Sequence, residues 1–249
     1  MRRMLSFTIA ALMVLALGAA PVFAEMMPIE PGTVKTYDSP NKKFQARISY
    51  GGIGVFLSLH EGDRTVWSTI SERPGMVAVS DNGSHVVLTT FGWEDEGGSD
   101  GFAVFGANGE EKQFRFNRFD NSKAAMKWVD VLSISPDGNR VAVLQGLKEG
   151  SEITVYSAVT GEPIWYLEDG DDEPVDVSWG PAGELLVATR DGEEGMMFLL
   201  VDEAGDVLAR RKMEKNFSYD VAAYGRFNGE GLPEIFELES GKFISFQTE

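Results

Sequence analysis

A short segment at positions 134 to 143, Ile-Ser-Pro-Asp-Gly-Asn-Arg-Val-Ala-Val, limits what this chain can fold into. Pro136 presets the backbone for the second position of a type I turn, and Asp137 is well tolerated at the third. Gly138 then occupies the position at which a hairpin needs a left-handed conformation. Apolar residues flank the turn on both sides. The segment therefore predicts two antiparallel strands joined by a tight turn, with Gly138 at positive φ.

The same turn pattern returns elsewhere in the chain. Related turns begin at Ser80 and Gly180, and a fainter copy begins at Ser39, each followed by apolar residues at strand spacing. The first residues of the four turns are separated by 41, 55 and 45 residues, close to the roughly 40 to 45 residues of a four-stranded propeller blade. The chain thus contains an internal repeat.

A second set of turns, each built on one glycine, follows between strand-like runs of residues. These turns contain Gly62, Gly109, Gly161, Gly205 and Gly241. Five such turns raise the predicted number of blades from four to five. The last repeat, at about 217 to 249, has lost the sequence signature of the first turn.

The Ser-Pro-Asp-Gly turn after an innermost strand resembles the WD40-like repeat of periplasmic TolB-type β-propellers. The resemblance is closest over 131–146 and extends in part to 76–90 and 175–189. It implies an all-β fold, namely a single β-propeller of about five four-stranded blades, or four if the C-terminal repeat is not a blade. It implies no catalytic residues, because this family shares an architecture rather than a chemistry.

The first 24 residues have the features of a secretory signal peptide. Arg2 and Arg3 precede an apolar run from Leu5 to Ala20, and Val22-Phe23-Ala24 forms a small-residue cleavage site. We therefore expect a signal peptide at 1–24, a propeller domain at 25–249, and a periplasmic or secreted protein. An uncleaved membrane anchor is the alternative, which the cleavage site disfavours. No later segment resembles a transmembrane span. The chain has no cysteine, so its fold must depend on its core rather than on disulfides.

The composition is strongly acidic. The chain has 39 acidic and 22 basic residues, a net charge of −17, which becomes −19 when Arg2 and Arg3 are removed with the signal peptide. Such a charge repels nucleic-acid phosphates and anionic lipid, so we expect neither as a partner. The acidity can also serve solubility alone.

Blade topology predicts that many acidic residues share one face. In an up-and-down blade, the turns after the first and third strands lie at one end, and the loops after the second and fourth strands lie at the other. The segment Gly229-Glu230-Gly231 is expected at this second end, together with the candidate partner-binding residues Trp93, Glu94, Asp95, Glu96, Asp191, Glu193 and Glu194. Weaker candidates for a metal, with calcium as the possible ion, are Asp95, Asp100, Asp169, Asp171 and Asp172.

Two patterns that suggest catalysis are set aside. Ser99 lies in a Gly-x-Ser-x-Gly sequence, but no helix signal follows it and both histidines, His60 and His85, precede it. Without cysteine, two histidines give no zinc or copper constellation, and we expect both to be hydrogen-bonded strand residues. Trp128, Trp165 and Trp179 are expected to fill the spaces between blades.

The sequence therefore indicates an exported, non-enzymatic binding scaffold whose acidic loop face meets an envelope or secreted protein, or a cation. A metal-assisted hydrolase or lactonase with its site at the acidic loop face is the alternative. A structural envelope subunit without a small ligand is a third possibility. No cofactor other than calcium is expected.

Overall fold

The computed structural model describes residues 30–51, 54–71, 74–91, 99–115, 128–146, 151–168, 173–191, 193, 195–218, 221 and 223–246. These residues form five antiparallel sheets, four with four strands and one with three. Within these ranges the secondary structure is β throughout, and no helix long and apolar enough to cross a membrane is found.

Each sheet is built from strands that follow one another in the chain. The first contains β1 (Val34–Asp38), β2 (Phe44–Gly51), β3 (Gly54–Glu61) and β4 (Arg64–Ser71). The second contains β5 (Pro74–Val79), β6 (Val86–Phe91), β7 (Ser99–Phe105) and β8 (Glu111–Arg115). The third contains β9 (Trp128–Ile134), β10 (Arg140–Gly146), β11 (Ser151–Ser157) and β12 (Pro163–Glu168). The fourth contains β13 (Glu173–Trp179), β14 (Leu185–Asp191), β15 (Gly195–Val201) and β16 (Val207–Met213), and the fifth contains β17 (Gly225–Phe227), β18 (Pro233–Glu237) and β19 (Lys242–Ser245).

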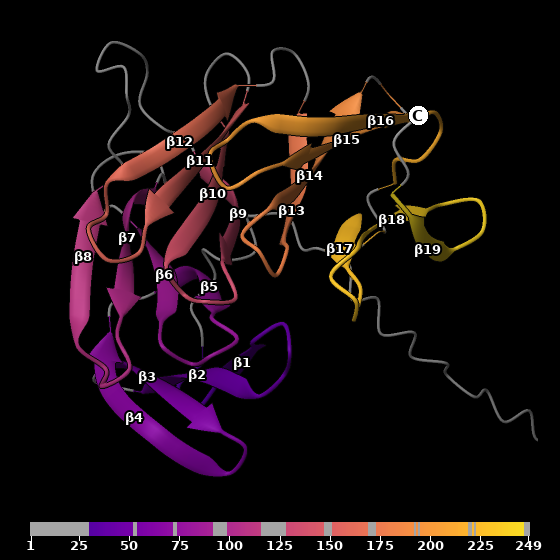
Figure 1. Ribbon diagram of the computed structural model, residues 1–249. Helices are drawn as coiled ribbons and strands as arrows, with labels where there is room; N and C mark the ends of the chain where they lie inside the picture. Colours follow the sequence, from indigo (N-terminus) through magenta and orange to yellow (C-terminus); the bar gives the residue numbers. More distant parts are fainter. Residues whose placement is uncertain are drawn as a thin grey trace, which may run out of the picture.

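The five sheets follow one another around an arc, like the blades of a propeller (Figure 1). The first strand of each sheet, β1, β5, β9, β13 or β17, lies innermost and contacts the first strand of the next sheet. This arrangement confirms the predicted all-β propeller of about five blades. The fifth blade differs from the prediction, because its described residues form three strands.

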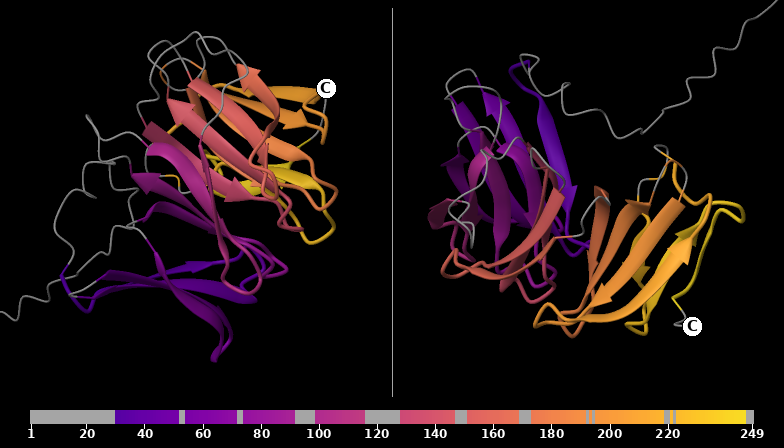
Figure 2. Two further views of the ribbon diagram at one scale, coloured as in Figure 1. Left: turned by 90° about the vertical axis from the view of Figure 1, so that its left-hand side faces the viewer. Right: turned by 90° about the horizontal axis from the view of Figure 1, so that it is seen from above.

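The hydrophobic core lies between the blades. Four clusters of buried residues fill the spaces between successive blades, from the first and second to the fourth and fifth. Trp165 and Trp179 belong to the cluster between the third and fourth blades, as predicted; the side chain of Trp128 lies outside the described part. No described cluster joins the fifth blade to the first, and the two sheets stand apart in both views of Figure 2. The described blades therefore form an open arc.

The turn at Ser135 has the predicted geometry. Gly138 has a φ of 78° and its N–H donates to the Ser135 carbonyl at 2.8 Å. The Ser135 hydroxyl donates to the Asp137 carboxylate at 2.6 Å and accepts from the Arg140 N–H at 3.0 Å. Burial of the Asp137 carboxyl acts to raise its pKa, but hydrogen bonds from Ser135 and Asn139 outweigh burial, so the pKa lies below its ordinary value. The prediction from Pro136 and Gly138 is confirmed.

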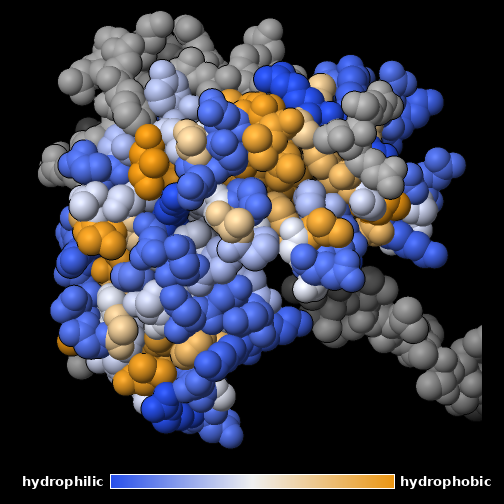
Figure 3. All heavy atoms as spheres, in the orientation of Figure 1, coloured by the Kyte–Doolittle hydropathy of each residue, from blue (hydrophilic) through white to orange (hydrophobic). Residues whose placement is uncertain are grey.

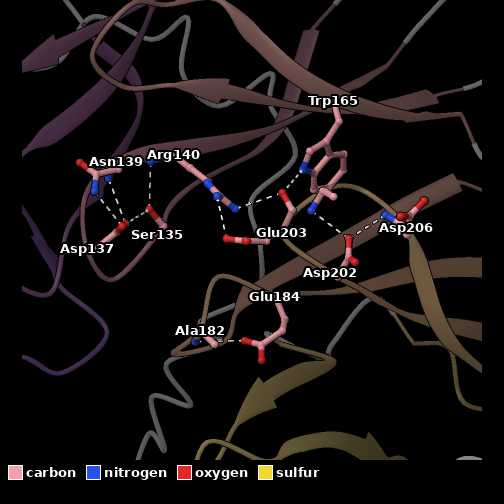
Figure 4. A network of polar contacts seen from close by, with 11 residues as sticks. Ser135, Asp137, Asn139, Arg140, Trp165, Ala182, Glu184, Asp202, Glu203 and Asp206 are labelled. Carbon is pink, nitrogen blue, oxygen red and sulfur yellow. Dashed lines mark hydrogen bonds and ion pairs between the residues drawn. The ribbon is translucent and has the colours of Figure 1, made fainter.

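Neighbouring turns are joined by hydrogen bonds around the arc. The Asn41 N–H donates to the Asp81 carboxylate at 2.7 Å, and the Asn82 amide donates to the Asp137 carbonyl at 2.8 Å. Between the third and fourth blades, Arg140 forms an ion pair with Glu203 at 3.0 Å (Figure 4). The Glu203 carbonyl also accepts from the Trp165 indole at 3.2 Å. This end of the molecule, which faces the viewer in Figure 3, is covered mainly by hydrophilic residues, with hydrophobic residues in scattered groups.

Two predictions about the fifth blade were wrong. The segment Gly229-Glu230-Gly231 belongs to the first turn of this blade, at Asn228–Gly231 between β17 and β18, so it lies at the tight-turn end and not with the acidic loops. Here Asn228 takes the place of serine, and its side-chain oxygen accepts from the N–H groups of Glu230 and Leu232 at 2.9 and 3.0 Å. The turn at Gly241 joins the second and third strands, β18 and β19, so it lies at the opposite end from the other four glycine turns.

Candidate functional site

Most of the predicted acidic site falls on residues whose placement is not described. Asp100 lies in β7, where only the backbone is described. Asp191 ends β14 and forms an ion pair with Lys212 at 2.7 Å, and Glu193 is exposed. The other candidates lie outside the described residues: Trp93, Glu94, Asp95, Glu96, Asp169, Asp171, Asp172 and Glu194. The acidic loop face therefore stays a prediction, and within the described ranges no three acidic or histidine side chains gather as metal ligands would.

The residues that suggested catalysis, Ser99 and the two histidines, lie in strands or beside them. Ser99 begins strand β7 rather than a strand-to-helix elbow. His60, in β3, has both ring nitrogens hydrogen-bonded, to Ser58 at 2.9 Å and Thr65 at 3.3 Å. The His85 ring contacts the Ser84 hydroxyl at 2.9 Å just before β6. Both histidines are thus hydrogen-bonded, as predicted, but only His60 is a strand residue, because β6 begins after His85.

The open arc instead exposes a surface that the sequence analysis missed. One face of the first blade packs against the second blade, and no described part of the chain packs on the other. We call this second face the head face; its side chains, assigned from the strand register, are Val34, Thr36, Asp38, Gln45, Arg47, Ser49, Phe56, Ser58, His60, Thr65, Ser68 and Ile70. In a propeller such a face is normally buried against a neighbouring blade, so its composition shows what it can contact.

An apolar row crosses the head face at the end away from the tight turns. Val34 pairs with Ser49, Ser49 with Phe56, and Phe56 with Ile70, so the four residues form a line across the sheet. Val34, Phe56 and Ile70 are 55%, 36% and 68% exposed. Single exposed apolar residues are ordinary, but three in register on one sheet are typical of an interaction surface.

The rest of the head face is polar and held in place by side-chain hydrogen bonds. Arg47 donates to Gln45 at 2.7 Å, and Gln45 donates to the Asp38 carboxylate at 2.7 Å. Burial, with a smaller contribution from the nearby Arg47 charge, holds the pKa of His60 below its ordinary value. The head face therefore presents the Arg47 cation, the Asp38 anion and the apolar row at fixed positions.

The packing of the turns also shows that the first blade lies at one end of the arc. Gly83 and Gly138 lie against the preceding blade, where an added Cβ would come within 2.5 Å of Phe44 and 2.3 Å of the Ser84 hydroxyl. The equivalent residue in the first blade is Lys42, which has a φ of 58° and an exposed side chain. In the second hairpin turns, Trp67 packs on Gly109 and Trp165 on Gly205, whereas nothing lies within 4 Å of a Cβ built at Gly62.

The fifth blade ends the arc with a different face. We call it the tail face; it consists of Arg226, Glu234, Phe236, Phe243 and Ser245, opposite the buried Ile235. The Arg226 guanidinium lies 2.7 Å from the Glu234 carboxylate and 3.9 Å from the centre of the Phe243 ring. Phe236 and Phe243 meet edge to face at 5.4 Å. Hydrogen bonds from Arg226 and Asn228 lower the pKa of Glu234.

Charge is distributed unevenly along the arc. Residues 30–73, which include the first blade, contain 6 lysines and arginines and 5 acidic residues. Residues 74–249 contain 14 basic and 33 acidic residues. The first blade is therefore close to neutral at one end of a strongly acidic molecule.

The fold and its two uncovered faces define a β-propeller-like protein that forms an open arc. No protein-family model matches the chain, and no curated protein sequence matches it. Among solved structures, the hydrazine synthase of Kuenenia stuttgartiensis is similar at a TM-score of 0.51 and 16% identity, over 84% of this chain and 57% of that chain. Dipeptidyl peptidase 4 of Porphyromonas gingivalis is similar at 0.52 and 10%, over 89% of this chain and 40% of that chain. This chain thus spans about half the length of these structures, and the likeness concerns the fold alone.

Proposed function

We propose that this protein is an exported, non-catalytic scaffold that binds another protein through its head face. The observation that carries the proposal is the exposed row of Val34, Phe56 and Ile70 on an otherwise polar, ordered sheet. Export is supported by the features of residues 1–24. An apolar row bordered by hydrogen-bonded polar groups has the anatomy of a protein interface.

We also propose that the acidic loop face, with Trp93, acts as a second surface that attracts a basic protein or a cation. Its support is the charge of the second to fifth blades, 33 acidic against 14 basic residues over 74–249. Such a field raises the rate of encounter with a basic partner and is screened by salt.

The head-face proposal can be tested with one charge placed in the apolar row. Ile70→Glu puts a carboxylate on an outer-strand residue that is 68% exposed, so the fold should tolerate it. The matched control is Ile164→Glu, on the outer strand β12 of the third blade, where the side chain is 42% exposed. After cross-linking in an envelope extract, the parent protein and the control should capture the same partner, and Ile70→Glu should lose it. Equal capture by all three proteins would contradict the proposal.

A further inference from the structure

We propose that the partner of the head face is the tail face of a second copy, so that copies of this protein associate head to tail. The inference rests on the proposed function and names the partner of the same surface. It follows from three matches between the two faces, in apolarity, in charge and in position along the blades.

The apolar parts of the two faces lie at the same level. On the head face, Val34, Ser49 and Phe56 lie at the strand ends remote from the first turn. On the tail face, Phe236 and Phe243 form the row that is remote from the turn at Asn228–Gly231. If the two sheets stack in the sense in which successive blades stack, Phe243 on the third strand of one copy meets Phe56 on the third strand of the other.

The charges also match strand by strand. Arg226 lies on β17 and Asp38 on β1, which are both innermost strands, and they carry opposite charges. Glu234 on β18 and Arg47 on β2, both second strands, are again opposite. At the turn itself, the exposed Glu230 of one copy lies at the level of the exposed Lys42 of the other. Opposite charges on the corresponding strands favour this register and disfavour a head-to-head contact, in which Arg47 faces Arg47.

The arc makes the contact intermolecular. The first and fifth blades of one chain stand apart, with no described hydrophobic cluster between them (Figures 1 and 2). A head-to-tail contact uses two different surfaces, so each copy that joins leaves a free head and a free tail. Sheets of three and four strands, about 4.8 Å apart, give faces only about 14 to 19 Å wide. The contact therefore belongs to the small, weak class of interfaces.

Sedimentation velocity over about 10 to 500 μM protein tests the inference, because this range brackets weak dissociation constants. At about 0.15 M salt the Debye length is about 8 Å, so repulsion between the acidic parts of two copies is screened. The weight-average sedimentation coefficient of the parent protein should rise with protein concentration. Phe56→Glu on the head face and Phe243→Glu on the tail face should each stay monomeric. A mixture of these two variants should again associate, but only as far as dimers, because each variant keeps one intact face.

Several outcomes would overturn the inference. One is a parent protein that stays monomeric throughout the range, and another is a mixture of the two variants that does not associate. Association of Phe243→Glu alone would mean that two head faces pair. Val34→Glu and Glu234→Lys serve as second head and tail variants if either phenylalanine variant lowers the melting temperature. If the parent is monomeric while Ile70→Glu still loses its envelope partner, the head face binds a different protein and only the second-copy inference fails.

Discussion

Asp176 shows how a single side chain joins two blades. Its carboxylate, on β13 of the fourth blade, accepts hydrogen bonds from the Tyr224 N–H at 2.7 Å and the Gly225 N–H at 3.2 Å at the start of the fifth blade. The carboxyl group is buried although part of the residue is exposed. Burial raises its pKa, and the backbone hydrogen bonds, which favour the ionised form, offset only part of this effect.

The raised pKa of Asp176 predicts a pH dependence of stability. Because the pKa is higher in the folded state than the ordinary value of about 3.9, the contribution of Asp176 is fully present below that value and is lost as pH rises through the folded-state pKa. Asp176→Asn keeps an acceptor oxygen without a charge. In urea unfolding, its free energy of unfolding relative to the parent should therefore rise between pH 4 and pH 7.

The control for this experiment is Asp206→Asn, at an exposed turn residue. It removes a carboxylate that lies away from the junction between the fourth and fifth blades. If the difference between Asp176→Asn and the parent is constant over this pH range, the ionisation of Asp176 does not affect the junction between the blades.

At the scale of the elements, the first turns of the second, third and fifth blades pack tightly against the preceding blade. Gly83, Gly138 and Gly231 would all clash with the preceding blade if they carried a Cβ, at 2.5, 2.3 and 2.8 Å. The glycine therefore meets two requirements, a left-handed backbone and close packing between blades. In the first blade only the backbone requirement remains, and Lys42 meets it.

Gly138→Ala and Gly62→Ala separate these two requirements. Both glycines have positive φ, 78° and 58°, but only Gly138 has neighbours within 4 Å of an added Cβ. Left-handed strain should cost each variant about 1 kcal/mol, and overpacking should cost Gly138→Ala about 1 to 3 kcal/mol more. Chemical denaturation of the two variants checks this ordering. Equal losses would mean that the second blade does not press on the turn at Gly138.

The turns were readable from sequence because their signals are local. Pro136 and Gly138 fix a turn within four residues, and the repeat of that signal located four of the five blades. The turn at Asn228 was missed because an asparagine oxygen there accepts from the Leu232 N–H, a hydrogen bond that serine hydroxyls accept in the first three blades. The head face could not be predicted from local signals. Whether Phe56 is covered depends on the position of the fifth blade, which begins about 170 residues further along the chain. In retrospect, Lys42 in place of a turn glycine was a local sign of that free end.

At the scale of the whole molecule, the acidity of the second to fifth blades predicts a response to cations. If the acidic loops hold calcium, the melting temperature of the protein should rise with calcium concentration and fall back with chelator, because a ligand of the folded state stabilises it by mass action. Changing Asp169, Asp171 and Asp172 to Asn should remove the rise. If the parent protein melts at the same temperature with calcium, with magnesium and with chelator, the acidic loops do not bind a cation. They could then act only as a protein-docking surface.

The most direct test of the open arc is a distance between the head and tail faces. The chain has no cysteine, so Thr36→Cys on the head face and Ser245→Cys on the tail face give two unique sites for spin labels, both at exposed positions. Pulsed electron–electron double resonance measures the distance between the two spin labels. Dilute labelled protein mixed with an excess of unlabelled protein limits the signal to label pairs within one chain. An open arc predicts distances well beyond about 20 Å, twice the roughly 10 Å between packed sheets. A single population at the spacing of packed sheets would show that the fifth blade closes on the first and that no head face exists.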